Sequence, residues 1–311
     1  MVRAVLAAFL LLVAGPGMAR ETVRLWPGTP PGSGAPSGPE HVGTEGAARG
    51  AYTNITTPRM EIYRPAHPNG AAVLVLGGGG YFRIQIDSAA RPIARWLAGE
   101  GVTAIVLFYR LPGDGWNEDA PFQDAQRALR MIRARASALH IDPHRLGVLG
   151  SSAGGHLAGI MATRGDHDFY AHVDAADDQP ATPDFAALIY PVISMRPPLD
   201  TTRTARHLRD LPDYRAAYSV EEHVGPATPP IFLAHALDDP IANPGHSLAM
   251  FQAMRAAHRP VEMHLFQHGG HSWGMGVPGR EVAAWPGLFL TWLRANGIVP
   301  GGAEAASTTS E

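Results

Sequence analysis

The sequence predicts an α/β fold in which helices cover both faces of a mostly parallel sheet. Short, almost continuously apolar runs alternate along the chain with longer segments of helical periodicity. Parallel strands that are covered on both faces show such runs, because neither face meets water. The 311 residues, of which 45% are hydrophobic and 17% charged, are enough for one large domain with a full core.

Six short apolar runs are expected to be the strands of this sheet. In chain order they are residues 71–76, 102–108, 146–149, 186–190, 231–235 and 261–266. Five helices are expected between and after them, at residues 88–98, 122–139, 153–163, 245–258 and 286–295. In the second helix, apolar residues recur at spacings of three and four, which leaves its arginines facing mostly outward: Arg127, Arg130, Arg133 and Arg135.

The two ends of the chain are expected to lie outside the folded domain. Residues 1–19 combine an early Arg3, an apolar run over 4–14, and the small residues Gly17 and Ala19 before a cleavage point, which is the layout of a secretory signal peptide. The alternative is an uncleaved anchor, although the run is short for a span of about 20 residues. We therefore expect a periplasmic or secreted bacterial protein without lasting membrane insertion.

Between the ends we expect one α/β domain over residues 51–298. The segment 20–50 is rich in Gly and Pro and predicts an extended N-terminal segment on the surface. Residues 194–229 are polar and interrupted by proline, so they are expected to form a cap-like insertion over the sheet edge. Residues 299–311 predict a flexible tail.

Composition excludes several chemistries. The chain has no cysteine, which rules out thiol catalysis, disulfides and thiolate zinc sites. All 25 cationic side chains are arginine, so Schiff-base lysines, P-loop lysines and serine–lysine dyads are also ruled out. The formal net charge of −3 gives no reason to expect nucleic acid or an anionic membrane as partner.

The stretch GSSAGG at residues 150–155 joins an expected strand to an expected helix. In a G-x-S-x-G turn the serine needs glycine two residues before and two after, because the turn is too tight for other side chains. Ser152 has Gly150 and Gly154, whereas Ser151 would need a glycine at Leu149, so Ser152 is the candidate nucleophile. The alternatives are an ordinary glycine-rich connection or a phosphate-holding loop.

A nucleophilic serine needs a base, and the base needs an orienting acid. Among the 15 histidines, His271 is the best candidate base, because it lies in a glycine-rich loop after an expected strand. The alternatives for it are a surface-loop histidine or, with His264 and His268, a metal ligand. His156 is expected to pack or to form hydrogen bonds locally instead.

The orienting acid is expected after the strand 231–235. Asp238 and Asp239 follow this strand, at the sheet edge where open α/β sheets place their chemistry, although either could be a turn residue beside proline. The chain order Ser, Asp, His is the order of the α/β-hydrolases.

The run Gly77–Gly80 comes directly after the first apolar strand. Backbone N–H donors in such a loop can approach a developing oxyanion without interference from a Cβ atom. The expected oxyanion donors are Ala153 and Gly78 or Gly79. A nucleotide-phosphate loop is the alternative, but the spacing is not G-x-G-x-x-G.

Over residues 55–296 the chain resembles the bacterial α/β-hydrolase esterases of the acetyl esterase, acetylxylan esterase and feruloyl-esterase-like group. The resemblance rests on five blocks and on the N-terminal stretch RLWPGTPPG; the blocks are GGGGY (77–81), FYRLP (108–112), IDPHRLGVLGSSAGGHLA (141–158), TPPIFLAHALDD (228–239) and FQHGGHSWG (266–274). It implies an α/β-hydrolase fold with Ser152 as nucleophile, His271 as base and Asp239 as acid. Asp239 is preferred over Asp238 because the family's acid stands four residues after a histidine, here His235.

The sequence departs from the family after the acid, where Ala242 and Asn243 replace the usual Val-Pro, so the choice between Asp238 and Asp239 stays open. Asp87 stands where relatives often carry an acid, and its role is open as well.

The resemblance implies a serine ester hydrolase that needs no metal or cofactor. An exported acetyl esterase acting on xylan or related plant oligosaccharides is the expected function. The alternatives are a general short-chain or feruloyl-type esterase, a peptidase, or a non-catalytic ligand-binding relative. Four aromatic residues have two alternative roles, in a sugar-facing rim or in simple packing: Trp116, Tyr214, Tyr218 and Trp273.

Overall fold

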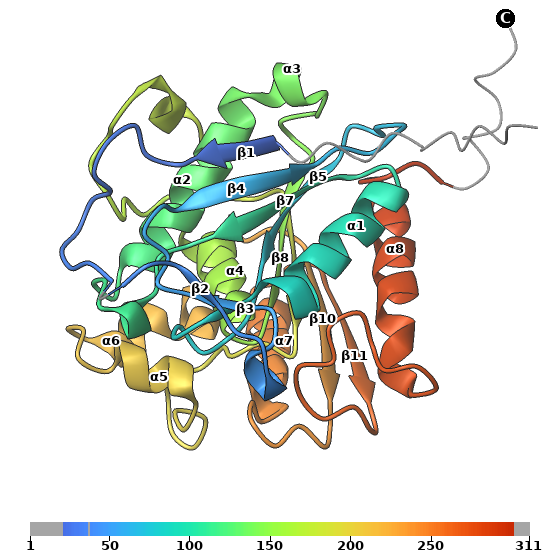
Figure 1. Ribbon diagram of the computed structural model, residues 1–311. Coiled ribbons are helices and arrows are strands. Elements are labelled where there is room, and N and C mark those ends of the chain that lie inside the picture. The colour runs from blue at the N-terminus through green and yellow to red at the C-terminus, as the bar shows by residue number, and fades with distance from the viewer. Residues whose placement is uncertain (1–20, 37, 302–311) are drawn as a thin grey trace, which may run out of the picture.

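The six apolar runs form the parallel part of an eight-stranded sheet in the computed structural model, which describes residues 21–36 and 38–301 (Figure 1). The strand order is β1-β4-β7-β5-β8-β9-β10-β11, with β1, β4 and β7 paired antiparallel and the remaining pairs parallel. The expected α/β architecture is therefore confirmed. The parallel strands are β5 (Ala72–Leu76), β7 (Thr103–Phe108), β8 (Leu146–Ser151), β9 (Phe185–Ile189), β10 (Ile231–Ala236) and β11 (Val261–Phe266).

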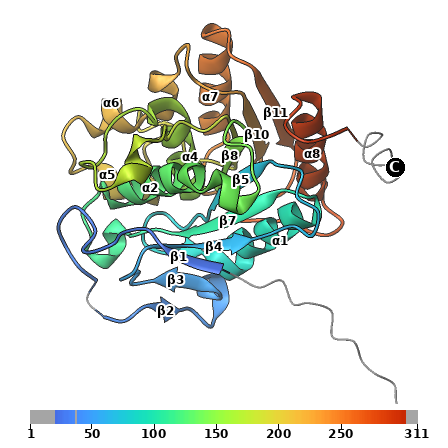
Figure 2. The ribbon, with the colours of Figure 1, turned by 90° about the horizontal axis from the view of Figure 1, so that it is seen from above.

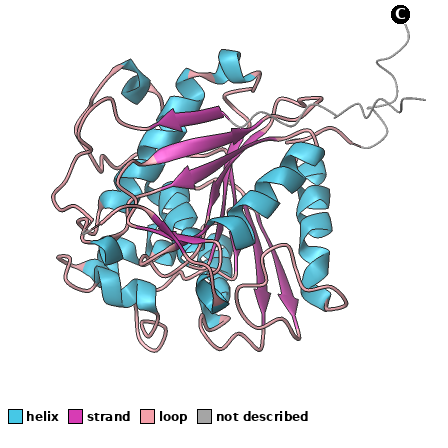
Figure 3. Ribbon diagram, in the orientation of Figure 1, coloured by secondary structure: helices cyan, strands magenta, loops and turns pink. Residues whose placement is uncertain are grey.

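The helices cover both faces of the sheet (Figures 2 and 3). They are α1 (Arg91–Gly99), α2 (Ala120–Ala134), α3 (Ala136–Leu139), α4 (Ala153–Arg164), α5 (Arg203–Leu208), α6 (Tyr214–Tyr218), α7 (Gly245–Ala256) and α8 (Trp285–Ala295). On one face α1 packs against α8 through Trp96 and Trp285, whose ring centroids lie 5.9 Å apart. On the other face lie α2, α4 and α7 (Figure 2). The expected helix 122–139 is split into α2 and α3 at Arg135, and a π-helical turn, Ile86–Ala90, precedes α1.

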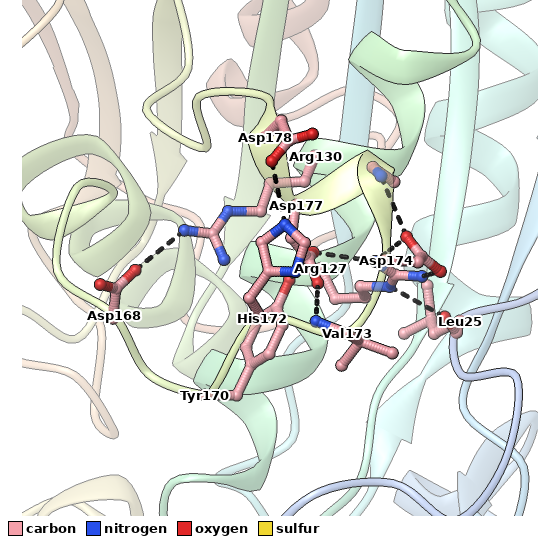
Figure 4. A network of polar contacts seen from close by, with 11 residues as sticks. Leu25, Arg127, Arg130, Asp168, Tyr170, His172, Val173, Asp174, Asp177 and Asp178 are labelled. Carbon is pink, nitrogen blue, oxygen red and sulfur yellow. Dashed lines mark hydrogen bonds and ion pairs between the residues drawn. The ribbon is translucent and has the colours of Figure 1, made fainter.

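Three of the four arginines expected to face outward are buried. Arg127, Arg130 and Arg133 are 2%, 9% and 7% exposed, so the expectation is wrong for them. The reason is that aspartates from distant loops cover the helix and neutralise the guanidinium groups, which helical periodicity cannot reveal. The ion pairs join Arg127 to Asp174 and Asp177, Arg130 to Asp168, and Arg133 to Asp184 (Figure 4 shows the first three).

The N-terminal segment 20–50 is more structured than expected. Strand β1 (Glu21–Arg24) pairs with β4 (Arg59–Tyr63) and extends the main sheet, and Trp26 is buried with its Nε1 donating to Asp124 Oδ1 at 2.8 Å. A second sheet of three strands joins β2 (His41–Val42), β3 (Ala51–Thr53) and β6 (Ile84–Gln85). This small sheet carries the turn at Gly46–Ala48 to the carboxyl edge of the main sheet. Residues 21–26 are therefore part of the main sheet and core, whereas the described residues from 27 to 49 are exposed or half-buried, as expected for a surface segment.

Residues 194–229 contain α5 and α6, and residues 201–204 of this stretch line the cavity described below. After α8, Ile298 and Val299 are buried at 9% and 5% exposure, so a tail that begins at residue 299 is wrong by at least one residue. The proposed signal peptide 1–19 and most of the proposed tail lie outside the described residues. Within 21–36 and 38–301, none of the helices combines the length and the apolar character that crossing a membrane requires.

Candidate active site

Ser152 occupies the tight turn between β8 and α4. Its backbone has φ 54° and ψ −120°, a conformation that residues other than glycine rarely adopt. Such strained backbone is typical of turns that carry a nucleophile. A Cβ at Gly150 would lie 2.0 Å from the carbonyl oxygen of Gly154, and a Cβ at Gly154 would lie 2.1 Å from that of Leu76. Both flanking positions therefore require glycine for steric reasons, as the motif spacing predicts.

His271 and Asp239 complete a hydrogen-bonded chain with Ser152. The Nε2 atom of His271 lies 2.9 Å from Ser152 Oγ, and its Nδ1 lies 2.6 Å from Asp239 Oδ2. The carboxylate can only accept, so Nδ1 carries the proton and Nε2 offers a lone pair to the serine hydroxyl. The imidazole is thereby held in the tautomer that a general base requires.

Asp239 is ionised in its buried position. Burial by itself would raise its pKa, but hydrogen bonds from His235 and His271 outweigh that effect and hold the pKa well below the ordinary value. Its second oxygen, Oδ1, accepts the backbone N–H groups of Ile241 at 2.8 Å and Ala242 at 2.9 Å. The carboxylate is thus fixed in orientation as well as in charge.

The structure separates the two neighbouring aspartates. Asp238 turns away from the imidazole, and its Oδ1 accepts the N–H groups of Gly269 at 2.8 Å and Gly270 at 2.7 Å. These two bonds hold the loop that carries His271. Of the two candidate acids, Asp239 is therefore the one in contact with His271, and Asp238 supports the loop.

His235 is a buried supporting residue whose role the sequence did not predict. Its Nε2 donates to the Ala242 carbonyl at 2.9 Å and approaches Asp239 Oδ2 at 3.2 Å. Because Nε2 carries the proton, Nδ1 accepts from the Ser247 hydroxyl at 2.7 Å. The position of this histidine four residues before Asp239 was the only signal in the sequence.

The three expected oxyanion donors surround Ser152. A Cβ at Gly78 would lie 2.9 Å from the Ser152 Cβ, so the backbone passes directly beside the serine. Gly79 has φ 137°, a conformation available to glycine, and lines the same cavity. Ala153 is the first residue of α4, where backbone N–H groups have no acceptor within the helix. Their action as oxyanion donors stays a prediction.

The other histidines of the motif region have separate partners. His264 bonds to Glu262 at 2.8 Å, and His268 lies 3.5 Å from Asp238. Within the part of the chain that the structure describes, no three His, Asp or Glu side chains are grouped as a metal site would need. His156 is fully buried and bonds to the Tyr81 hydroxyl and to the Tyr218 carbonyl, in agreement with the packing interpretation. Asp87 pairs with Arg91.

A cavity of about 830 Å³ opens in front of Ser152 and His271. This volume lies in the range of small-molecule sites. Four elements contribute to its walls: the Gly78–Gly80 loop, the turn at Gly46, Phe82 with Arg83, and the start of α5. The Ser152 hydroxyl therefore faces a cavity with room for a small-molecule ligand.

The four aromatic residues for which a rim and packing were the alternatives do not line this cavity, so the rim alternative is wrong and the packing alternative holds. Trp273 packs on Tyr190 with ring centroids 4.4 Å apart, and Tyr218 stacks on Phe122 at 4.9 Å. The Nε1 of Trp116 donates to the Ile55 carbonyl, and Tyr214 packs against the core. All four side chains therefore contribute to packing. The residues that they contact lie far away in the sequence, so the sequence pattern alone does not reveal these contacts.

The fold, the serine turn and the hydrogen-bonded chain define an α/β-hydrolase. More specifically, the chain belongs to the BD-FAE family, whose model matches residues 60–254. It is 28% identical over 229 residues to the acetylxylan esterase of Xylanibacter ruminicola, an alignment that covers 70% of this chain and 44% of that protein. The chain spans less than half the length of the curated relatives that it matches.

Solved structures agree with this family. The acetyl ester-xyloside bifunctional hydrolase from Caldicellulosiruptor lactoaceticus superposes with a TM-score of 0.71 at 32% identity, covering 87% of this chain and 98% of that one. The carboxylesterase Cest-2923 from Lactobacillus plantarum gives a TM-score of 0.68 at 26% identity, covering 79% and 95%. In sequence and in structure the chain is therefore similar to carboxylic ester hydrolases of the acetylxylan-esterase-like group.

Proposed function

We propose that the protein is a serine carboxylic-ester hydrolase in which Ser152 is the nucleophile, His271 the general base and acid, and Asp239 the orienting acid. The observation that carries this proposal is the chain of two hydrogen bonds, 2.9 Å from His271 to Ser152 and 2.6 Å from His271 to Asp239. The strained backbone of Ser152 at the start of α4 supports it, since the serine is held out toward the cavity.

In the first half of the reaction, His271 Nε2 takes the Ser152 proton while Oγ attacks the ester carbonyl. The N–H groups of Ala153 and of Gly78 or Gly79 stabilise the resulting oxyanion. Collapse of the tetrahedral intermediate breaks the bond to the alcohol oxygen, which receives the proton from His271. The products are a Ser152 ester and the free alcohol.

In the second half, a water molecule takes the place of the alcohol. His271 removes one proton from it, the hydroxide attacks the acyl carbonyl, and the proton returns to Ser152 Oγ as the carboxylic acid leaves. Asp239 stays ionised throughout and stabilises the imidazolium that forms in each half.

The substrate that we propose is an acetyl ester of xylan or of a related plant oligosaccharide. The names of the two relatives from X. ruminicola and C. lactoaceticus, which refer to acetylxylan and to an acetyl ester with a xyloside, support this choice. The open cavity of about 830 Å³ has room for a sugar ring beside the ester. A general short-chain or feruloyl-type esterase is the second candidate, favoured by the similarity to a carboxylesterase.

A panel of esters separates these candidates. Acetylated xylo-oligosaccharides, 4-nitrophenyl esters of rising acyl length and a feruloyl ester would be compared by kcat/KM. Preference for acetyl over longer acyl groups, together with release of acetate from the oligosaccharides, is expected. Faster hydrolysis of long-chain or feruloyl esters would contradict the acetyl-esterase assignment while leaving the serine mechanism intact.

We also propose export to the periplasm or the medium, on the basis of the signal-like residues 1–19. N-terminal sequencing of protein recovered from the periplasmic and culture fractions is the test. A mature chain beginning at Arg20 is expected, and recovery of uncleaved protein in the cytoplasm alone would contradict the proposal.

A further inference from the structure

The cavity in front of Ser152 has a strongly one-sided charge. Its lining includes four arginines and, among the described residues, no aspartate or glutamate; the arginines are Arg49, Arg83, Arg203 and Arg206. The whole chain carries a formal charge of −3, so this concentration of positive charge is local to the cavity. A cleft lined by one sign of charge attracts ligands of the opposite sign.

Arg83 and Arg203 share one aromatic ring. The guanidinium carbon of Arg203 lies 4.1 Å from the centroid of Phe82, and that of Arg83 lies 4.9 Å from the same centroid. Contact with the ring holds both cations in place, although two positive charges so close together repel each other. Burial and the neighbouring Arg203 lower the pKa of Arg83 from its ordinary value.

Arg83 is half-buried and Arg203 is exposed, and neither forms an ion pair with an acid of the described residues. The buried Nε of Arg83 has no hydrogen-bond partner among these residues. Among the other arginines, the buried Arg110 and Arg127 pair with Asp124 and Asp177, and the half-buried Arg91 pairs with Glu61. The half-buried Arg164 and Arg259 donate to backbone carbonyls instead. Placing a guanidinium group without a counter-ion in a partly buried site is unfavourable. Arg83 has neither an acid nor a carbonyl partner among the described residues, which points to a counter-ion that arrives with a ligand.

The side-chain stems of the two arginines lie beside the glycine loop that contains the predicted oxyanion donor Gly79. A Cβ at Gly79 would lie 2.9 Å from Arg83 Cγ, and a Cβ at Gly80 would lie 3.2 Å from Arg203 Cβ. Both arginines line the cavity that Ser152 and His271 also line, so an anion bound between the guanidinium groups would share this cavity with the ester. Planar guanidinium groups match a carboxylate by paired N–H···O bonds.

We propose that Arg83 and Arg203 bind a carboxylate of the substrate, so that the enzyme acts preferentially on esters that carry an anionic group near the scissile bond. An acetylated oligosaccharide that contains a sugar acid is the substrate class that fits. This inference rests on the proposed ester-hydrolase function and specifies its substrate.

Two matched pairs of esters test the inference, one for each side of the ester bond. On the alcohol side, 4-acetoxybenzoate is compared with the neutral 4-acetoxybenzamide. On the acyl side, monoethyl succinate is compared with ethyl levulinate, in which a methyl ketone replaces the carboxylate. Each kcat/KM is measured at low and high salt for the wild-type protein and for Arg83→Gln, Arg203→Gln and Arg83→Lys.

The readout is the ratio of kcat/KM between the anionic and the neutral ester of a pair. We expect a ratio of about tenfold or more in at least one pair, as for a charge-assisted hydrogen bond, and a decrease of this ratio at high salt. Arg83→Gln and Arg203→Gln should bring the ratio close to one, and Arg83→Lys should restore part of it. Arg95→Gln, an exposed change on α1 away from the cavity lining, is the matched control and should keep the wild-type ratio.

Ratios close to one in both pairs, or ratios that neither glutamine variant alters, would overturn the inference while hydrolysis of the neutral esters upholds the proposed function. Failure of the wild-type protein to hydrolyse any of the four esters would contradict the proposed function itself.

Discussion

The Tyr81 hydroxyl lies 2.9 Å from Nδ1 of His156, and this buried bond joins the glycine loop to helix α4. Tyr81 directly follows Gly77–Gly80, and His156 lies in the first turn after Ser152. Nε2 of His156 donates to the Tyr218 carbonyl at 2.8 Å, so Nδ1 must accept from the tyrosine. The bond therefore fixes the distance between the predicted oxyanion donors and the nucleophile.

Replacement of Tyr81 by phenylalanine should weaken this connection. The buried Nδ1 of His156 would lose its donor, at a cost of about 1–3 kcal/mol in the free energy of unfolding. Urea denaturation measures the effect, with Tyr214→Phe as the control, because among the described residues the Tyr214 hydroxyl makes no hydrogen bond. An equal stability of the two variants would show that the Tyr81 bond contributes little.

Asp239 and Asp238 should respond very differently to the same change. Asp239→Asn removes the charge that orients His271 and should lower kcat by about 10⁴-fold, the effect known for the corresponding change in serine proteases. Asp238→Asn keeps an oxygen that can accept from Gly269 and Gly270, so a loss below about tenfold is expected from the weaker bond alone. Steady-state kinetics on 4-nitrophenyl acetate would decide, and equal losses would argue against Asp239 as the orienting acid.

Replacement of glycine by alanine should disrupt the structure at Gly150 and stabilise the protein at Gly287. At Gly150 the added Cβ would lie 2.0 Å from the Gly154 carbonyl, so Gly150→Ala should disrupt the serine turn and abolish activity. At Gly287, on the exposed side of α8, nothing lies within 4 Å of the added Cβ. Gly287→Ala should therefore stabilise the protein by about 0.5–1 kcal/mol through helix propensity. Thermal unfolding and activity together test the pair, and an active, stable Gly150→Ala protein would contradict the steric account of the turn.

Stability should fall between neutral and mildly acidic pH. Burial lowers the pKa of His156 to about 4 and that of His246 to about 3, from an ordinary value of 6.5. Below pH 6.5 the unfolded chain therefore binds protons that the folded protein cannot accept, and the free energy of unfolding decreases as pH falls. The loss by pH 5 should be on the order of 2 kcal/mol for each of the two histidines. Urea denaturation at pH 7.5 and pH 5.0 checks this, and equal stability at both values would contradict it.

The sequence predicted the parts of the fold that depend on local pattern. Each parallel strand appeared as an apolar run, and the glycine spacing selected Ser152 over Ser151 because the motif places its two glycines at fixed positions around the serine. The order of Asp239 and His271 after their strands was also readable, since the carboxyl ends of parallel strands share one edge.

Features that depend on contacts between distant segments were missed. The edge strand β1 and the small sheet are short and polar, and the burial of Arg127 depends on aspartates about 50 residues away in the chain. The sequence left the rim and packing roles of the four aromatic residues open for the same reason, because an aromatic side chain has the same local sequence pattern whether it packs inside or lines a cavity. Arg83 and Arg203 come together only through Phe82 and α5, which no spacing rule reveals.

The most direct test of the central claim is the kcat of Ser152→Ala on 4-nitrophenyl acetate, with Ser151→Ala as the matched control. If Ser152 is the nucleophile, its removal should lower kcat by several powers of ten, in line with the roughly 10⁶-fold loss in a serine protease. Ser151→Ala should retain activity within about tenfold, because that serine lies outside the chain formed by Asp239, His271 and Ser152. Near-normal turnover by a folded Ser152→Ala protein would contradict the account.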